Sequence, residues 1–134
     1  MSEPADHIAK ARRLLASGRH SLAGDFVPEA ARQGYLGVFH AAQAYVISKV
    51  GRRPKTHGGV RSEFSRLAHE HGEIAADLVA FLGRSYEYKT YADYGASEAA
   101  APAPTRDEAR RALEIGARFV EEVAALLGLD PDAP

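Results

Sequence analysis

The feature that most constrains the fold is an apolar stretch, YLGVFHAAQAYVISKV, from Tyr35 to Val50. Its large side chains recur every three or four positions, which aligns them on the faces of an α-helix. Two adjacent stripes result. The first consists of Tyr35, Phe39, Ala42, Val46 and Val50, and the second of Leu36, His40, Gln43 and Ile47. A helix that is apolar around so much of its circumference needs cover on several sides. We therefore expect it, over about residues 28–51, at the centre of a helical bundle.

The same spacing predicts four further helices, over about residues 4–16, 56–72, 73–91 and 105–127. We expect the following side chains to face inward: Ile8, Ala11 or Arg12, Leu15, Val60, Phe64, Leu67, His71, Ile74, Leu78, Phe81, Leu82, Ser85, Ala112, Ile115, Phe119, Val123 and Leu126. No segment alternates apolar and polar residues with a period of two. The sequence therefore predicts an all-α fold.

Glycine, proline and capping residues mark the expected connections. Gly18 and Gly24 weaken the helical pattern, so we expect residues 17–26 to be a connector or a broken helix. Thr56 is suited to cap the third helix, and Thr105 with Glu108 fits a capping box.

The chain has 134 residues, the size of one domain. Residues 95–105, GASEAAAPAPT, are small and proline-rich, which predicts an exposed and mobile linker. Residues 128–134 form a polar tail by composition. We therefore expect a single helical domain over residues 1–134.

Composition excludes several kinds of site. The chain has no cysteine, which excludes disulfides, a thiol nucleophile and thiolate metal ligands. His69 and His71 are two positions apart and diverge around a helix, so we expect no metal site and no cofactor. No apolar run approaches the roughly 20 residues that a membrane span needs. The amino-terminal MSEPADHIAK lacks the pattern of a secretory signal, so a cytoplasmic location is the default expectation.

The charge is distributed unevenly along the chain. The formal net charge is −1, but residues 1–66 hold 11 Lys and Arg against 5 Asp and Glu, whereas residues 67–134 hold 6 against 13. The densest acid-free run contains Lys49, Arg52, Arg53, Lys55 and Arg61. Such a run presents a basic face to RNA, a nucleotide or an acidic partner. The competing interpretation is a solvated loop, with head-to-tail association of the dipolar chains.

Three motifs in order carry a resemblance to a known family. The first contains Tyr35, Phe39, His40, Ala41 and Ala42, the second Pro54, Lys55, Thr56, His57 and Gly58, and the third Ala92, Asp93 and Tyr94. Together they resemble the HEPN domains (higher eukaryote and prokaryote nucleotide-binding), over about residues 5–127. The similarity is to a branch of small prokaryotic HEPN proteins.

This resemblance implies an up-and-down bundle of four to five helices that commonly forms a homodimer. Many members of the family are encoded beside a minimal nucleotidyltransferase and act as the toxin of a toxin–antitoxin pair. Catalytic members are metal-independent ribonucleases with an Arg-x(4–6)-His motif near the end of a late helix. Its histidine moves protons near pH 7, and its arginine holds the scissile phosphate.

The chain departs from that motif. The matching segment is Lys89-Thr-Tyr-Ala-Asp93-Tyr94, with lysine for arginine and no histidine. Lysine is a point charge and cannot make the bidentate phosphate contact of arginine. We therefore expect the catalytic motif to be lost, and the candidate catalytic residues that remain are Lys89, Asp93, Tyr94 and His40. Asp93 is otherwise expected to contact a basic residue or a helix terminus.

Two interpretations stand for each of the remaining site residues. His40 is either a half-buried histidine hydrogen-bonded to a neighbouring helix or a residue facing a cleft. The tyrosines near the end of the fourth helix either pack with their hydroxyls at the rim or stack on bases. The loop before the third helix is either a capping turn or an anion site, in which free N–H groups assist the cations. The residues of the predicted ligand site are Arg52, Arg53, Lys55, Thr56, His57 and Gly58.

These observations lead to one hypothesis and one alternative. The hypothesis is a dimeric HEPN bundle that binds nucleotide or RNA and works with a nucleotidyltransferase in a toxin–antitoxin-like system. The alternative is an active metal-independent ribonuclease toxin that uses a non-standard residue set.

Overall fold

The computed structural model describes residues 2–95 and 102–132, and within these ranges it contains six α-helices and no strand. The helices are α1 Glu3–Ala23, α2 Val27–Val50, α3 His57–His71, α4 Ala76–Arg84, α5 Tyr86–Tyr94 and α6 Arg106–Leu126. The all-α prediction is confirmed. None of these helices is long and apolar enough to cross a membrane.

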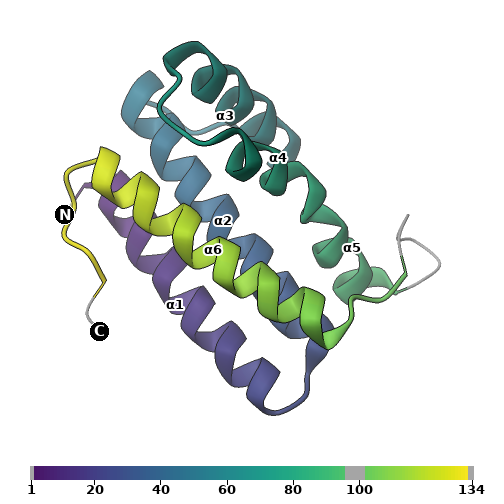
Figure 1. The fold of residues 1–134 in the computed structure, drawn as a ribbon. Helices are drawn as coiled ribbons and strands as arrows, with labels where there is room; N and C mark the ends of the chain where they lie inside the picture. The colour runs from purple at the N-terminus through teal and green to yellow at the C-terminus, as the bar shows by residue number, and fades with distance from the viewer. Residues whose placement is uncertain (1, 96–101, 133–134) are drawn as a thin grey trace.

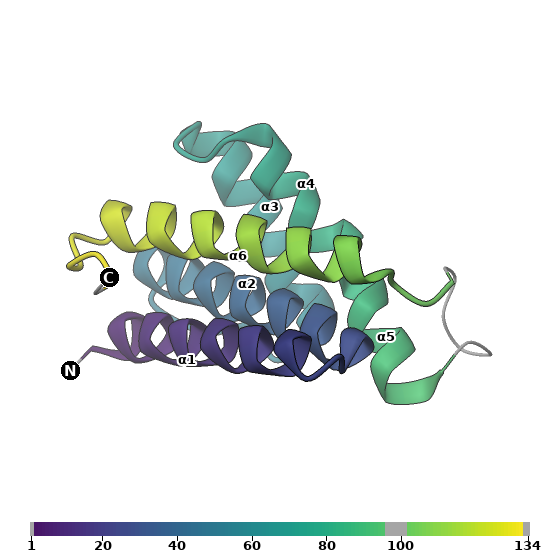
Figure 2. The same ribbon diagram turned by 60° about the horizontal axis from the view of Figure 1, so that its bottom comes forward.

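Helix α2 lies at the centre of the bundle, as its apolar pattern predicts. Helices α1, α2 and α6 lie side by side, and α3 and α5 pack on the remaining sides of α2 (Figures 1 and 2). Buried side chains occur along α2 from Ala30 to Ile47. Val50, at its end, is 40% exposed and is not part of the core. The apolar circumference of α2 is thus covered within one chain.

Helix α1 continues through Gly18 to Ala23, so the predicted end near residue 16 is wrong. The reason is close packing between helices. A Cβ at Gly18 would lie 2.5 Å from Cδ2 of Leu113 on α6, and a Cβ at Gly37 of α2 would lie 2.9 Å from Cδ2 of Leu15 on α1. Because these glycines let α1, α2 and α6 approach closely, tertiary packing outweighs the low helix propensity of Gly18.

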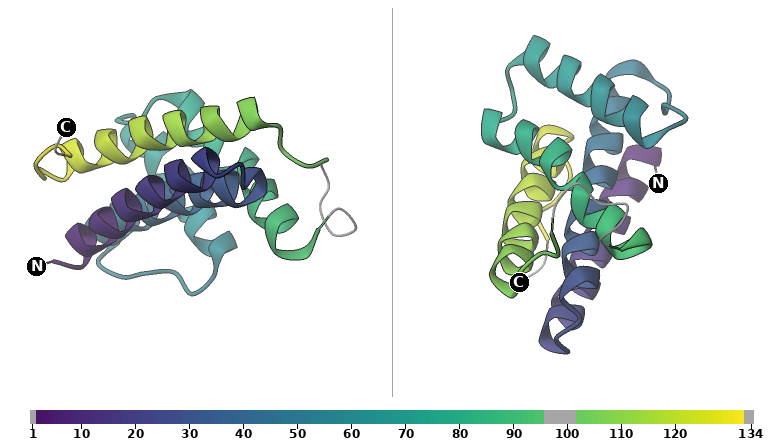
Figure 3. Two further views of the ribbon diagram at one scale, coloured as in Figure 1. Left: turned by 90° about the horizontal axis from the view of Figure 1, so that it is seen from below. Right: turned by 90° about the vertical axis from the view of Figure 1, so that its right-hand side faces the viewer.

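The predicted fourth helix is interrupted at Ser85, which separates α4 from α5. The buried Ser85 hydroxyl donates a hydrogen bond to the carbonyl of Leu82 at 3.3 Å, and the chain bends there. The two segments occupy the place of one helix in a bundle of four to five. In Figure 3, right, α3 and α4 lie together at the upper end of α2, and α5 continues down along it.

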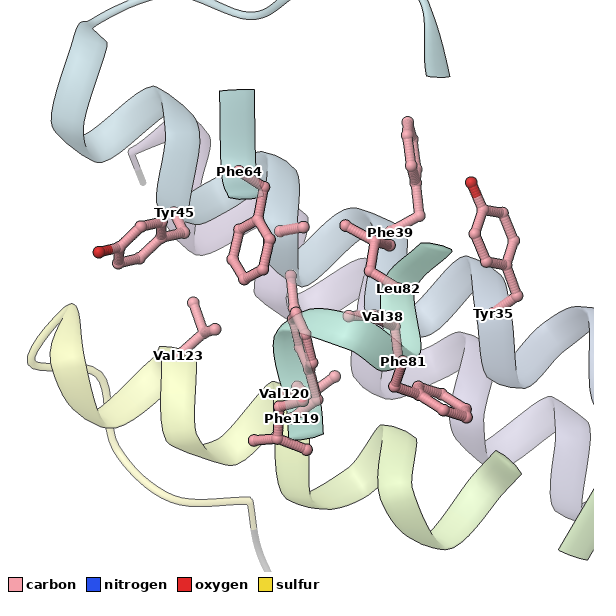
Figure 4. Packing of buried hydrophobic residues seen from close by; sticks show 14 of the residues in the cluster. Tyr35, Val38, Phe39, Tyr45, Phe64, Phe81, Leu82, Phe119, Val120 and Val123 are labelled. Atoms are coloured by element: carbon pink, nitrogen blue, oxygen red, sulfur yellow. The ribbon is translucent and has the colours of Figure 1, made fainter. Parts of the chain in front are cut away.

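Aromatic rings from three helices fill the centre of the core (Figure 4). Phe64 of α3 lies edge-on to Tyr45 of α2 at 5.5 Å and beside Phe119 of α6 at 5.3 Å, measured between ring centroids. These contacts join α3 to the α1–α2–α6 layer. Tyr35 and Phe39, nearer the start of α2 than Tyr45, point away from α6 (Figure 4).

The predicted capping residues are confirmed. The Thr56 hydroxyl accepts a hydrogen bond from the N–H of Gly59 at 2.9 Å, and Thr105 and Glu108 form the capping box of α6. Three residues predicted to face inward are not buried in the structure: His71 is exposed, Leu126 is 41% exposed and Ile115 is half-buried.

The predicted linker and tail fall partly outside the described residues, since 96–101 and 133–134 lie beyond them. Of the described linker residues, Pro104 is buried, in contrast to the expected exposure.

Candidate functional site

The candidate site lies at the start of α3, where His57, which follows the loop 51–56, packs against α2. His57, the first residue of α3, is hydrogen-bonded through Nδ1 to the hydroxyl of Tyr35 at 3.1 Å. Its imidazole also lies parallel to the ring of Phe39, with 3.9 Å between centroids and 10° between planes. Tyr35 and Phe39 are four positions apart on α2 and therefore present one face to His57. These contacts fix the start of α3 against the centre of the bundle.

The N-terminus of α3 supplies free backbone donors. The N–H of Gly59 bonds to the Thr56 side chain and that of Val60 to the Thr56 carbonyl. The N–H groups of His57 and Gly58 donate to no acceptor in the described part of the chain. Unpaired N–H groups and the helix dipole together favour an anion at this position.

A cavity of about 490 Å³ lies beside this helix start. Its lining includes Phe39 and Gln43 of α2, and Arg53, Lys55, Thr56 and His57. No acidic side chain lines it. Arg53 and Lys55 are exposed and form no ion pair with any residue of the described ranges. The cavity therefore combines two unpaired cations with the N-terminus of a 15-residue helix.

The other predicted ligand residues lie around this cavity rather than in it. Arg52 lines a neighbouring cavity of about 420 Å³, which shares Arg53 and Lys55 with the first and is also lined by Glu63 and Arg66. Gly58 is exposed in the first turn of α3. Lys49 is 3.0 Å from Glu73 and is thus paired with an acid from outside the basic run.

His57 is neutral at pH 7. Burial lowers its pKa from 6.5, and the nearby charges of Lys89 and Arg61 lower it further. Arg61, one turn along α3, places its guanidinium 4.0 Å from the ring centroid of Tyr86 on α5. Any positive charge offered to a ligand in the cavity therefore comes from Arg53 and Lys55 rather than from His57.

His40 lies on α2 with its Nδ1 3.0 Å from Nδ1 of His7 on α1. This geometry matches the interpretation of a half-buried histidine bonded to a neighbouring helix. Burial lowers the pKa of His40 to about 4, and Lys10, His7 and His57 contribute. Burial also lowers the pKa of His7, against an opposing effect of Glu3. Both rings are therefore neutral at pH 7, with one N–H shared between them.

Two of the catalytic candidates on α5, Lys89 and Asp93, form an ion pair with each other. Asp93 Oδ1 is 2.8 Å from Arg32 Nε of α2, and Asp93 Oδ2 is 2.8 Å from Lys89 Nζ. The hydrogen bond from Lys89, with the charge of Arg32, lowers the pKa of Asp93. Asp93 thus ties α5 to α2, as the expected contact with a basic residue implies. Within the described residues, no hydrogen bond or ion pair joins these groups to His40.

The tyrosines of α5 differ in how deeply they are buried. Tyr86 and Tyr88 are half-buried and pack against the core, and Tyr86 lies edge-on to Tyr35 at 5.5 Å between centroids. Tyr94 is 65% exposed at the end of α5.

The sequence placed Tyr35 and Phe39 in an apolar stripe and in the first family motif, but it did not indicate that both contact His57. Their spacing of four residues was available as a signal. Pairing with His57 depends on how the loop returns to α2, which spacing within one helix does not specify.

Comparison with known proteins gives the same family as the three motifs. The model of the HEPN domain family matches residues 5–126. Two proteins of Methanocaldococcus jannaschii are also similar to the chain. "Putative toxin MJ0142" is 27% identical over 90 residues, which cover 67% of this chain and 60% of that protein. "Putative toxin MJ0605" is 27% identical over 99 residues, which cover 74% of this chain and 69% of that protein.

Proposed function

Since the chain belongs to the HEPN domain family, we propose that it is a toxin-like HEPN protein that binds a phosphate-bearing ligand, nucleotide or RNA. The observation that carries this proposal is the cavity at the start of α3, where Arg53 and Lys55 stand unpaired beside the helix N-terminus. Two lysine or arginine charges and free N–H groups are the usual means by which proteins hold phosphate.

The walls of the cavity suit the rest of a nucleotide. Phe39, Pro54 and Val60 supply apolar surface, and Gln43 supplies an amide that can donate and accept hydrogen bonds. A phosphate at the N-terminus of α3 would leave a base or sugar facing these groups. A merely solvated loop would need neither a cavity lining without acids nor the fixed position of His57.

The toxin-like role rests on the two relatives, both of which are named as toxins. Homodimerisation and a nucleotidyltransferase partner belong to the same proposal. Because α2 is covered within one chain, a dimer interface has to use other apolar surface, and Phe26, Val50, Tyr94 and Leu126 are the exposed large hydrophobic side chains of the described residues. Light scattering at micromolar concentration should give about twice the 14.4 kDa of one chain, and a monomer there would remove this part of the proposal.

The alternative of a ribonuclease gains little support from the site. Lys89 and Asp93 are paired with each other, Asp93 also holds Arg32, and His40 is bonded to His7. A catalytic role for Lys89 or Asp93 would first have to break this network.

The binding proposal is tested by titrating the protein with ATP and with a short single-stranded RNA while amide NMR shifts are followed. The expected result is weak binding at low salt, with shifts concentrated at residues 53–60, that disappears as salt is raised. Shifts elsewhere, or none at low salt, would overturn the proposal.

A further inference from the structure

A second cavity, of about 530 Å³, lies between α3 and α4 and is not part of the site described above. The two helices lie together at the end of the molecule remote from the α1–α2 turn (Figures 1 and 3). The α3 wall carries Arg61, Ser65 and His69. These residues are spaced by four positions and thus form one polar stripe along the helix.

The opposite wall is apolar and made of short side chains. Ala76, Val79, Ala80 and Gly83 of α4 recur at helical spacing along it, and Ile74 and Leu82 belong to the core beneath. A Cβ added at Gly83 would meet no atom within 4 Å. The groove is therefore open because its α4 wall lacks large side chains.

The polar wall is only partly satisfied within the protein. Arg61 lies beside the Tyr35 hydroxyl, where burial raises the pKa of Tyr35 and the hydrogen bond and charge of Arg61 oppose that rise. Arg61 forms no ion pair within the described ranges, and its Nη1 atom is buried without a hydrogen-bond partner there. The side chains of Ser65 and His69 likewise make no hydrogen bond to the described residues. Tyr86 stacks on one face of the Arg61 guanidinium and fixes its position. Because an unpaired buried guanidinium nitrogen is costly, it indicates a missing acceptor.

We propose that this groove binds a small amphipathic carboxylate, with its apolar body against α4 and its carboxylate on Arg61. The cavity has the volume of a small-molecule site, and it joins an apolar wall to a few convergent polar groups. A single guanidinium balances a single negative charge, which favours a monocarboxylate over a phosphate. This distinguishes the groove from the cavity at the start of α3, which offers both Arg53 and Lys55.

The proposal is tested with octanoate as the probe, in titrations followed by amide NMR shifts. Octylamine carries the same apolar body with the opposite charge, and acetate carries the carboxylate without the body. Octanoate is expected to shift residues 61–83 of α3 and α4, whereas octylamine and acetate leave them unchanged. Equal binding of octylamine would show that the carboxylate is not recognised, and would overturn the proposal.

Matched variants locate the binding. Gly83→Phe fills the groove from its open side and Arg61→Gln removes the charge, and each should weaken octanoate binding by about tenfold or more. Gly83→Ala leaves most of the groove open and should bind as the parent does. Gly83→Phe also preserves the test if Arg61→Gln fails to fold.

Two further results separate this proposal from others. The double variant Arg53→Ala with Lys55→Ala should keep octanoate binding, because it changes only the cavity at the start of α3. If Gly83→Phe leaves octanoate binding intact but alters the mass by light scattering, the groove is a surface between protein chains and the proposal fails.

Discussion

The ring of Phe39 lies flat against the imidazole of His57, with 3.9 Å between the two centroids. Phe39 belongs to the central helix and His57 is the first residue of α3. This contact and the Tyr35–His57 hydrogen bond hold the first residue of α3 against the core, beside the cavity lined by Arg53 and Lys55. A loop rich in Arg, Lys, Gly and Pro is thereby anchored at one end.

The first prediction concerns this anchor. Tyr35→Phe removes the hydroxyl and leaves Nδ1 of the half-buried His57 without its partner, so the free energy of unfolding should fall by about 1 kcal/mol. Urea denaturation followed by circular dichroism measures the loss. Tyr94→Phe, at an exposed hydroxyl, is the matched control and should change nothing. Equal stability of Tyr35→Phe and the parent would mean that the hydrogen bond does not hold His57.

Histidine burial should make stability depend on pH. The pKa of His40 is about 4 in the folded protein and near 6.5 in the unfolded chain, so the unfolded chain binds more protons between these values. Stability contributed by neutral His40 is therefore present above about pH 6.5, lost as the pH falls toward 4, and constant below. After allowance for solvent screening, the loss should be about 1–2 kcal/mol.

Denaturation of the parent and of His40→Gln at pH 7 and pH 5 tests this dependence. Above about pH 5, Asp93 contributes little change, because its folded pKa is lowered from 3.8 and its stabilisation is lost only as the pH falls below that value. His7 and His57 should leave a smaller residual slope in the variant. An identical slope in parent and variant would contradict the account of His40.

Close packing of the three long helices gives a matched pair of substitutions. Gly18→Ala places a Cβ 2.5 Å from Leu113, so it should destabilise the protein by about 1–3 kcal/mol despite alanine's higher helix propensity. Gly83→Ala meets open space and should stabilise it by about 0.5–1 kcal/mol. Thermal unfolding of both variants measures the difference. Similar shifts in the two would indicate that Leu113 moves aside at little cost.

The sequence predicted most of the fold because the apolar spacing is regular. The central position of α2 and the caps at Thr56 and Thr105 follow from patterns within a few residues. The continuation of α1 through Gly18 could not be predicted, since it depends on contact with Leu113, 95 positions away in the numbering of the chain. The break at Ser85 could not be predicted for a different reason: Ser85 lies on the predicted inner face, so the spacing of inward residues continues across it.

The candidate site was predicted in part. Lys55, Thr56 and His57 are neighbours in the sequence, so their grouping needed no tertiary information. Which cations face the cavity did depend on the tertiary structure. Lys49 forms an ion pair with Glu73, Arg61 packs on the ring of Tyr86, and of the basic run only Arg53 and Lys55 line the cavity. A run of like charges in a sequence does not reveal which side chains the fold pairs.

A fourth prediction concerns catalysis. Because Lys89 and Asp93 neutralise one another and no histidine stands at the family position, the purified protein should leave single-stranded RNA uncut over hours without added metal. Gel electrophoresis of a labelled RNA measures this. Cleavage that disappears in Lys89→Ala or Tyr94→Phe would instead support the ribonuclease alternative.

The most direct test of the central claim compares two double variants of equal charge. Arg53→Ala with Lys55→Ala removes the cations of the cavity, and Arg13→Ala with Arg19→Ala removes two exposed arginines of α1 that form no ion pair within the described residues. Binding of ATP and of a short RNA is measured by calorimetry at low salt. The first pair should weaken binding by about 1–3 kcal/mol, the scale of charge-assisted contacts, with helicity unchanged, and the second should leave it nearly as in the parent. Equal losses in both pairs would show that only net charge matters, and would contradict a phosphate site at the start of α3.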